Sequence, residues 1–179
     1  MKMKVTETLA QFTPEECDQI ILYGDRQPLQ KNSISKEDDP YFRDCRIHWI
    51  DINPMTGWMF RKFLPLFSEV NISRMEVLQY TVYNQGMYCG WHIDDTKKDD
   101  HGGDRVATAI LQLSGPDDYD GGELQILLED ETAPGAGDEK AFTVHKKKGS
   151  VIFFQGDVCH RVTKVTRGAR KTLVCWGLK

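Results

Sequence analysis

Two histidines and one aspartate in this sequence have the residue types and the spacing of a metal site. His92 and Asp94 are two residues apart, so on an extended strand their side chains point to the same face. His160 lies much further along the chain, in a second segment with strand character. Two imidazoles and one carboxylate form the facial triad, which leaves positions on Fe(II) open for a co-substrate and for dioxygen. The three residues therefore predict a non-haem Fe(II) site.

Arg170 could supply an anion-binding group beside such a site. It follows His160 on the next predicted strand, past a turn expected at residues 167–168. A buried guanidinium is costly unless it meets an anion, and its planar fork suits a carboxylate held by two hydrogen bonds. A dicarboxylic keto acid could then chelate the metal at one end and bind Arg170 at the other.

Six segments extend this pattern along the second half of the chain. They are residues 83–87, 92–94, 105–108, 118–124, 148–150 and 160–170. Through these segments the sequence resembles the Fe(II)- and 2-oxoglutarate-dependent dioxygenases, specifically the prolyl 4-hydroxylase group and its bacterial and viral PKHD-type branch. The resemblance covers about residues 74–179. It implies an α+β, mainly β fold, in which a double-stranded β-helix (jelly-roll) core is supported by N-terminal helices.

The resemblance also implies a role for each matching position. His92, Asp94 and His160 match the iron ligands. Arg170 matches the residue that binds the distal carboxylate of 2-oxoglutarate. Relatives that halogenate lack the carboxylate found here at Asp94, so the resemblance argues against halogenation.

Four further positions are expected around the cofactors. Tyr83 matches a tyrosine that lines the metal and co-substrate pocket. Ile110 and Gln112 share a strand face that contacts 2-oxoglutarate in relatives, where a tyrosine often replaces the glutamine. Trp176 shares the strand face of Arg170 by parity, at a place where relatives keep a tryptophan beside the iron.

The implied function is a hydroxylase that consumes O2 and 2-oxoglutarate and releases succinate and CO2. The expected substrate is a prolyl residue of a protein or peptide, hydroxylated at C4, and ascorbate is a further cofactor that the resemblance raises. The motifs do not separate this substrate from a free amino acid or small metabolite, so that alternative stays open.

Three other functions fit the sequence less well. A nucleic-acid demethylase of the same superfamily would carry an asparagine two residues beyond the first arginine after its second histidine, and the stretch 161–170 has none. A zinc site using Cys89 or Cys159 requires side chains that strand parity places on the face opposite the neighbouring histidine. A non-catalytic binding module would show a degraded ligand set, whereas every ligand is present here.

Length and composition limit the number of domains, the kinds of partner and the cellular location. The 179 residues are expected to form one domain over 1–179, with helical support in about 1–73 and the core in about 74–179. A net charge of −4 argues against a polyanionic partner. No apolar run is long enough for a membrane span, and the N-terminus lacks an apolar signal core. Five cysteines without a C-x-x-C pair favour a reducing, cytoplasmic location.

The elements that position the site follow from periodicity. A capping box at residues 13–16 predicts a helix that ends near Gly24. A strand is expected at 46–52, and a second helix from about 53 to 70, shortened by Pro65. Residues 31–41 read as a surface loop, whereas 94–104 and 129–140 read as candidate lids. Strands are predicted at 74–84, 87–93, 105–113, 122–128, 141–145, 150–154, 158–165 and 170–178.

Overall fold

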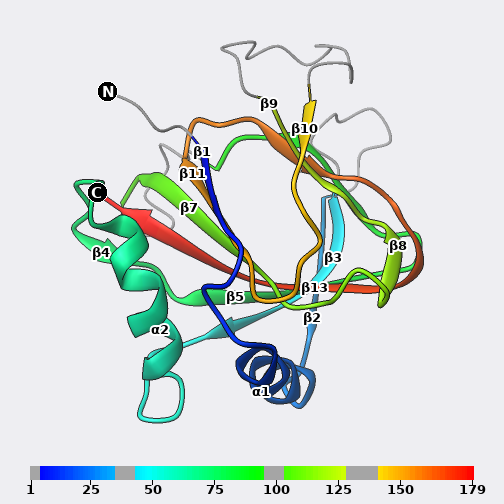
Figure 1. Cartoon of the computed structure of the whole chain (residues 1–179), viewed down its shortest axis with the longest axis horizontal. Coiled ribbons are helices and arrows are strands. Elements are labelled where there is room, and N and C mark those ends of the chain that lie inside the picture. The colour runs from blue at the N-terminus through cyan, green and yellow to red at the C-terminus, as the bar shows by residue number, and fades with distance from the viewer. Residues whose placement is uncertain (1–4, 35–42, 95–102, 128–140) are drawn as a thin grey trace.

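The computed structural model describes residues 5–34, 43–94, 103–127 and 141–179. Within them a 13-stranded antiparallel sheet curls on itself, and the helices lie to one side of it (Figure 1). The helices are α1 (Pro14–Asp25), α2 (Gly57–Phe63) and the 3-10 helix η1 (Leu64–Phe67). The strands are β1 (Val5–Thr8), β2 (Gln30–Ile34), β3 (Arg43–Ile50), β4 (Arg74–Met75), β5 (Leu78–Asn84), β6 (Tyr88–His92), β7 (Arg105–Gln112), β8 (Tyr119–Gly121), β9 (Leu124–Leu127), β10 (Ala141–Thr143), β11 (Val151–Gln155), β12 (His160–Val162) and β13 (Val165–Leu178).

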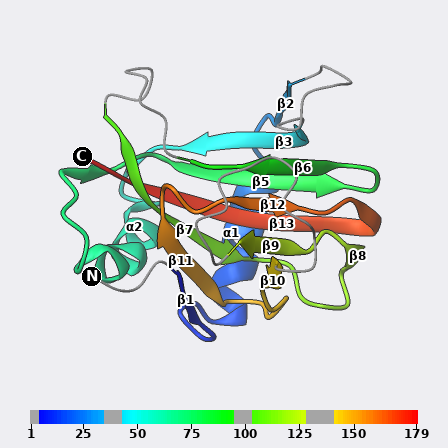
Figure 2. The ribbon, with the colours of Figure 1, turned by 90° about the horizontal axis from the view of Figure 1, so that it is seen from above.

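The path of the sheet makes two facing layers. Neighbouring strands follow the order β1-β11-β7-β13-β5-β3-β6-β12-β9-β10, with β13 paired to both β7 and β5. Seen from above, β6, β12 and β9 overlie β5, β13 and β7 (Figure 2). Strands far apart in sequence therefore face each other across one interior, as in a jelly roll, and the predicted fold class is confirmed.

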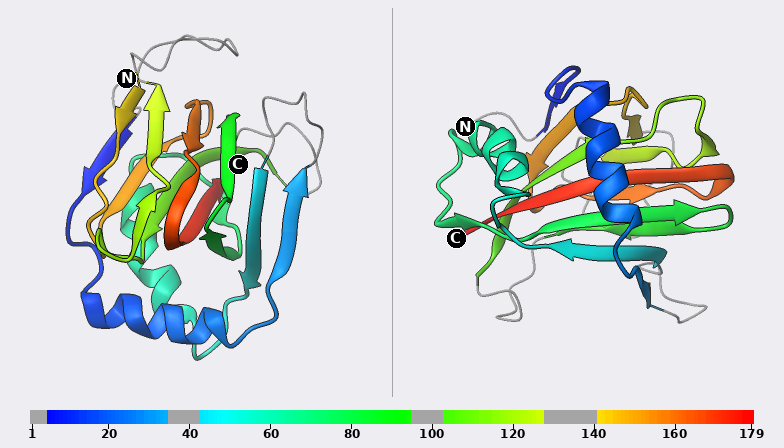
Figure 3. Two further views of the ribbon diagram at one scale, coloured as in Figure 1. Left: turned by 90° about the vertical axis from the view of Figure 1, so that its right-hand side faces the viewer. Right: turned by 90° about the horizontal axis from the view of Figure 1, so that it is seen from below.

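The first helix packs against the outer face of the layer that contains β5, β13 and β7, called the larger layer from here on (Figure 3). Thr13 and Glu16 form the predicted capping box, and Pro14 occupies the first turn. Gly24 does not end the helix, which continues to Asp25. A Cβ at Gly24 would lie 2.6 Å from the ring of Tyr80 on β5, so the glycine permits close helix-to-sheet packing.

Two apolar cores follow from strand alternation. One core lies between the helices and the outer face of the larger layer, and the other fills the interior between the two layers. The first contains Phe12, Cys17, Ile20, Phe63, Tyr80, Leu111, Leu173 and Cys175. The second contains Ile47, Tyr83, Ile110, Tyr119, Ile126, Phe154, Val174 and Trp176. Successive residues of β13 alternate between these cores, so one strand both anchors the helices and lines the interior.

Several predicted boundaries were wrong for local physical reasons. Residues 30–34 form β2 on the edge of the sheet rather than the start of a loop, because edge strands carry polar residues. The first third thus supplies β1, β2 and β3 besides helices. The turn expected at 167–168 is instead part of β13, where Gly168 adopts φ +71° just after a register shift between Val165 and Arg167.

Other expectations held or fall outside the described residues. The helix expected over 53–70 is shortened at Pro65, since α2 gives way to η1 at Leu64. Most of the two candidate lids, residues 95–102 and 129–140, lies outside the described residues. No helix in the described part of the chain has the length and hydrophobicity needed to cross a membrane. The single-domain assignment of 1–179 stays a prediction.

Candidate active site

His92, Asp94 and His160 meet inside the jelly roll. Their candidate ligand atoms all lie within 4.8 Å of one another. His92 ends β6 and pairs directly with His160 on β12, which brings the two rings to a centroid separation of 4.1 Å. Asp94 lies just beyond β6, and each of its oxygens is 3.7 Å from the Nε2 of one histidine. Among the described residues, this is the one cluster of three or more such side chains.

Backbone carbonyls fix the orientation of both imidazoles. Nδ1 of His92 lies 2.9 Å from the carbonyl oxygen of Gly90, and Nδ1 of His160 lies 3.0 Å from that of Val158. A nitrogen facing a carbonyl must carry a proton, so in the neutral form of each ring the lone pair sits on Nε2, which faces Asp94. This is the arrangement that metal-binding histidines adopt.

The surroundings also set the protonation of the three side chains. Burial lowers the pKa of His160 to about 4, and the neighbouring His92 acts in the same direction. Burial would also lower the pKa of His92, but Cys89 and Asp94 together raise it to about 9. Burial alone would raise the pKa of Asp94, and the two histidines lower it. At neutral pH Asp94 is therefore ionised and His160 neutral, whereas His92 is protonated and would release its proton when a metal binds.

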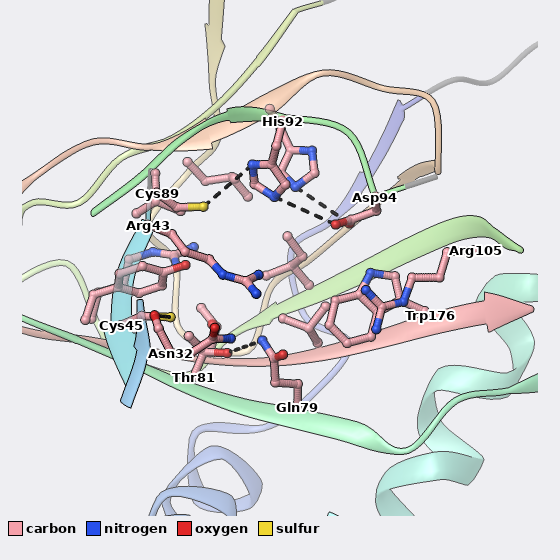
Figure 4. Close-up of a pocket in the computed structure, with 18 of the residues that line it drawn as sticks. Asn32, Arg43, Cys45, Gln79, Thr81, Cys89, His92, Asp94, Arg105 and Trp176 are labelled. Atoms are coloured by element: carbon pink, nitrogen blue, oxygen red, sulfur yellow. Dashed lines mark hydrogen bonds and ion pairs between the residues drawn. The ribbon is translucent and has the colours of Figure 1, made fainter. Parts of the chain in front are cut away.

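The cluster lines a pocket of about 750 Å³, counting its open mouth, that also contains unpaired donors (Figure 4). Arg170 is 2% exposed, and its Nε has no hydrogen-bond partner among the described residues. Nε1 of Trp176 is also buried, and its N–H faces Asp94 and helps to lower the pKa of that carboxyl. A buried donor without a partner is costly, and a bound acid would satisfy the Nε of Arg170. The donor set and this unpaired Nε fit Fe(II) with 2-oxoglutarate.

The structure brings most of the predicted pocket residues together. Arg170, Thr172, Val174 and Trp176 alternate along β13 and line the pocket, which confirms that Arg170 and Trp176 share a face. Tyr83 lines it from β5, and its ring centre lies 5.6 Å from the guanidinium carbon of Arg170.

Ile110 and Gln112 lie on one face of β7, near the C-terminal end of the strand. Ile110 lines the main pocket, whereas Gln112 lines a smaller adjoining one that also reaches Arg170. The Gln112 amide donates to the Ser114 carbonyl and to the Tyr119 hydroxyl, at 2.9 and 3.0 Å. Both of its hydrogens are therefore in use, and its expected contact with 2-oxoglutarate stays a prediction.

Strand parity misplaced one side chain. Cys89 and His92 were expected on opposite faces, yet both line the pocket, and the Cys89 sulfur lies 3.6 Å from Nδ1 of His92. The register between β6 and β12 shifts between His160 and Val162, so simple alternation fails there. Cys89 faces the nitrogen remote from Asp94 and is not part of the ligand cluster.

Sequence reasoning also missed several residues around the site. Thr108 donates a 2.7 Å hydrogen bond to Asp94 from β7. Arg43 lines the pocket from β3, where its alternation with Cys45, Ile47 and Trp49 was a signal that it faces the interior. Arg105 forms an ion pair with Glu76, which lies between β4 and β5 and binds it at 2.8 Å.

Residues 78–177 match the family model of the 2OG-Fe(II) oxygenase superfamily, where 2OG is 2-oxoglutarate. The chain belongs to this superfamily. The matched segment contains the His92, Asp94 and His160 cluster together with Arg170 and Trp176. The prediction of an Fe(II)/2-oxoglutarate-dependent enzyme with these two cofactors is thereby confirmed for the family, whereas ascorbate stays a prediction.

Relatives in this superfamily share about a third of the aligned residues. A PKHD-type hydroxylase of Xanthomonas euvesicatoria is 35% identical over 116 residues, covering 62% of this chain and 47% of that protein. A PKHD-type hydroxylase of Xanthomonas campestris is 30% identical over 151 residues, covering 81% of this chain and 59% of that protein. The chain thus spans about half the length of the curated relatives it matches.

Solved structures of oxygenases have the same fold. A prolyl-4-hydroxylase of Pseudomonas putida superposes with a TM-score of 0.72 at 18% identity, covering 98% of this chain and 92% of that chain. The viral collagen prolyl hydroxylase of Paramecium bursaria Chlorella virus-1 superposes with a TM-score of 0.71 at 20% identity, covering 97% and 95%. At these identities the likeness shows the jelly-roll fold.

Proposed function

We propose that this protein is an Fe(II)- and 2-oxoglutarate-dependent hydroxylase that uses O2 and acts on a prolyl residue of a protein or peptide. One observation carries the proposal. A cluster of two histidines and an aspartate, its ligand atoms within 4.8 Å of one another, shares a pocket with the buried guanidinium of Arg170, whose Nε has no partner among the described residues. The three side chains can hold a metal while the guanidinium binds the far carboxylate of a dicarboxylic keto acid.

The chain supplies positioning, and the cofactors supply the oxidation. When bound, Fe(II) couples the oxidative decarboxylation of 2-oxoglutarate by O2 to insertion of one oxygen atom into a substrate C–H bond, giving succinate and CO2. His92, Asp94 and His160 would hold the metal on one side, since their orientation is already fixed by Gly90, Val158 and Thr108. Because these three ligands would occupy one side of the metal, its opposite side would stay open to 2-oxoglutarate and O2.

Arg170 and its neighbours would hold the co-substrate. The guanidinium would bind the distal carboxylate, and Trp176 lines the same pocket with its Nε1–H toward Asp94. Burial raises the pKa of Tyr83, so its phenol stays protonated and can donate a hydrogen bond beside Arg170. Ile110 and Val174 supply apolar walls that exclude water from the reacting groups.

A peptidyl prolyl substrate is supported by the relatives. The similar bacterial proteins are named PKHD-type hydroxylases. A prolyl hydroxylase of Trichoplax adhaerens with the same fold, at a TM-score of 0.73, is described in complex with a peptide fragment from the oxygen degradation domain of hypoxia inducible factor. The described residues do not fully enclose the pocket of this chain, so a side chain of a peptide could enter it.

The test is turnover on proline-containing peptides, followed by mass spectrometry. We expect succinate formation to depend on Fe(II) and 2-oxoglutarate, and the substrate peptide to gain one oxygen atom at proline. Asp94→Ala should abolish both signals, whereas Asp120→Ala, an exposed aspartate paired with Arg167, should not. Retention of normal turnover by Asp94→Ala would show that the cluster is not the metal site.

We also infer a reducing compartment such as the cytoplasm. All five cysteines of the chain are free, and four of them are buried. Oxidising compartments favour paired cysteines, so this pattern supports the inference.

A further inference from the structure

Arg43 is a second cation in the pocket for which the cofactors provide no counter-ion. It is the first residue of β3, paired with Cys89 on β6 and with Ile34 on β2. Cys89 in turn contacts His92, so Arg43 lies one strand away from a proposed metal ligand. It lines the pocket on the same strand face as Cys45 and Trp49.

The guanidinium of Arg43 has no hydrogen-bond or ion-pair partner among the residues that the structure describes. Its Nε is buried without a hydrogen bond, and no ion pair joins it to another described residue. The adjacent Asp44 points to the other face of the strand and does not line the pocket. Arg105 in the same pocket is different, because Glu76 neutralises it through two hydrogen bonds of 2.8 Å. Arg43 therefore resembles Arg170 rather than Arg105, as a donor that awaits an anion.

When Fe(II) and 2-oxoglutarate are bound, the charges in the pocket balance without Arg43. Asp94 and the two carboxylates of 2-oxoglutarate bring three negative charges. Fe(II) and Arg170 bring three positive charges, and the Arg105–Glu76 pair is neutral. Arg43 is the remaining charged side chain among the described residues that line the pocket. A partly buried cation of this kind is stabilised by an anionic ligand.

Neutral hydrogen-bonding groups line the neighbouring part of the pocket. Thr81 and Gln79 on β5 and Asn32 on β2 lie across the pocket from His92 and Asp94 (Figure 4). Thr81 accepts a 2.9 Å hydrogen bond from the Gln79 amide, so its own hydroxyl hydrogen remains available to donate. Neither the metal ligands nor Arg170 requires these groups, which leaves them for a substrate.

We propose that Arg43 binds a carboxylate of the substrate, so that the hydroxylated group is presented next to an acidic function. The proposal rests on the function proposed above and narrows its substrate class. Two sources share this chemistry. One is the main-chain carboxylate of the hydroxylated residue itself, at the C-terminal end of a peptide, and the other is an acidic side chain beside the prolyl residue.

The test compares matched pairs of probes on the protein loaded anaerobically with Fe(II) and 2-oxoglutarate, by calorimetric titration. The first pair is N-acetyl-L-proline and its neutral amide. The second pair is the amidated peptide acetyl-Asp-Pro-Gly and its Asn-Pro-Gly counterpart. A charged hydrogen bond in a partly desolvated site predicts that one acidic probe binds at least about tenfold more tightly than its neutral partner. The pair that shows the preference identifies the source of the carboxylate.

Variants then assign the preference to Arg43. Arg43→Gln should abolish it, and Arg43→Lys should keep part of it. Arg46→Gln, the same change three residues along β3 at an exposed position, should leave it intact. Affinity for 2-oxoglutarate should stay within about twofold of wild type in Arg43→Gln, since Arg170 is assigned to the co-substrate.

Other results would contradict either the role of Arg43 or the proposed function. A preference that survives Arg43→Gln, or the absence of a preference for either acidic probe in the wild-type protein, removes the proposal. A loss of 2-oxoglutarate affinity in Arg43→Gln as large as in Arg170→Gln also removes it, because Arg43 would then serve the co-substrate. If the wild-type protein does not bind 2-oxoglutarate with Fe(II), the proposed function falls, and this inference falls with it.

Discussion

Thr108 holds Asp94 in place from the neighbouring strand. Its hydroxyl donates a 2.7 Å hydrogen bond to Oδ2 of the carboxylate, and both side chains are buried. Asp94 lies two residues beyond the end of β6, and its backbone N–H donates to the carbonyl of Gly156. The hydrogen bond from β7 therefore helps to orient the carboxylate.

Replacing this hydroxyl should weaken metal binding. Thr108→Val keeps the shape of the side chain but removes the donor, so Asp94 can rotate away from the two histidines. Loss of such a supporting contact typically lowers metal affinity by about 10- to 100-fold. Titration with Fe(II) or Mn(II) measures the change, and Thr108→Ser, which keeps the hydroxyl, should bind like wild type. Equal affinities for Thr108→Val and wild type would show that the hydrogen bond does not position the ligand.

Removing the guanidinium of Arg170 should separate co-substrate binding from metal binding. Arg170→Gln deletes a buried charged donor, so affinity for 2-oxoglutarate should fall at least about tenfold. Metal affinity should change little, because Arg170 is not among the ligands. The matched control is Arg167→Gln on the same strand, whose exposed side chain pairs with Asp120. A similar loss in both variants would point to a general effect on β13.

The contact between α1 and the sheet should not tolerate a methyl group. Gly24→Ala favours the helix by propensity, but its Cβ would lie 2.6 Å from the Tyr80 ring. Overpacking of this kind costs about 1–3 kcal/mol, so the free energy of unfolding should fall. At Gly57, in α2, a Cβ meets its nearest atom at 3.4 Å, the end of the flexible Arg61 side chain. Urea unfolding should therefore show Gly57→Ala near wild type and Gly24→Ala clearly below it.

Alkaline pH should destabilise the fold through Cys17. Burial raises the pKa of this thiol from 9.0 to about 11. The unfolded chain therefore loses the thiol proton at lower pH than the folded protein does. The contribution to stability is complete below pH 9 and declines as the pH rises toward 11.

Comparison with Cys17→Ala isolates this effect from other titrating groups. The variant begins with lower stability at neutral pH, because a buried side chain is truncated. Its urea midpoint should then fall less steeply with pH than that of wild type. Parallel pH profiles for the two proteins would show that another group causes the alkaline loss.

The chemistry of the site was more predictable from sequence than its surroundings. Metal ligands and a carboxylate-binding arginine must be particular residue types, so His92, Asp94, His160 and Arg170 stand out at their spacings. Most core strands were also visible, because residues that alternate between two apolar cores, as on β13, leave a clear pattern.

What the sequence did not reveal depends on pairing between distant strands. Whether Cys89 shares a face with His92 is decided by an irregular register between β6 and β12, which no local pattern encodes. Arg43 could be recognised as a pocket residue only once β3 was known to cross the interior beside β6. Gly168 resembles a turn residue, and it became part of β13 because that strand pairs with β8.

In the proposed function, His92, Asp94 and His160 hold Fe(II) while Arg170 holds 2-oxoglutarate. The most direct measurement is the visible charge-transfer absorption of the protein mixed anaerobically with both cofactors, since the band requires the keto acid to chelate the bound metal. We expect the band in wild type and in Asp120→Ala, its loss in Asp94→Ala, and a higher 2-oxoglutarate requirement in Arg170→Gln. Absence of the band in wild type, or an unchanged band in Asp94→Ala, would contradict the account.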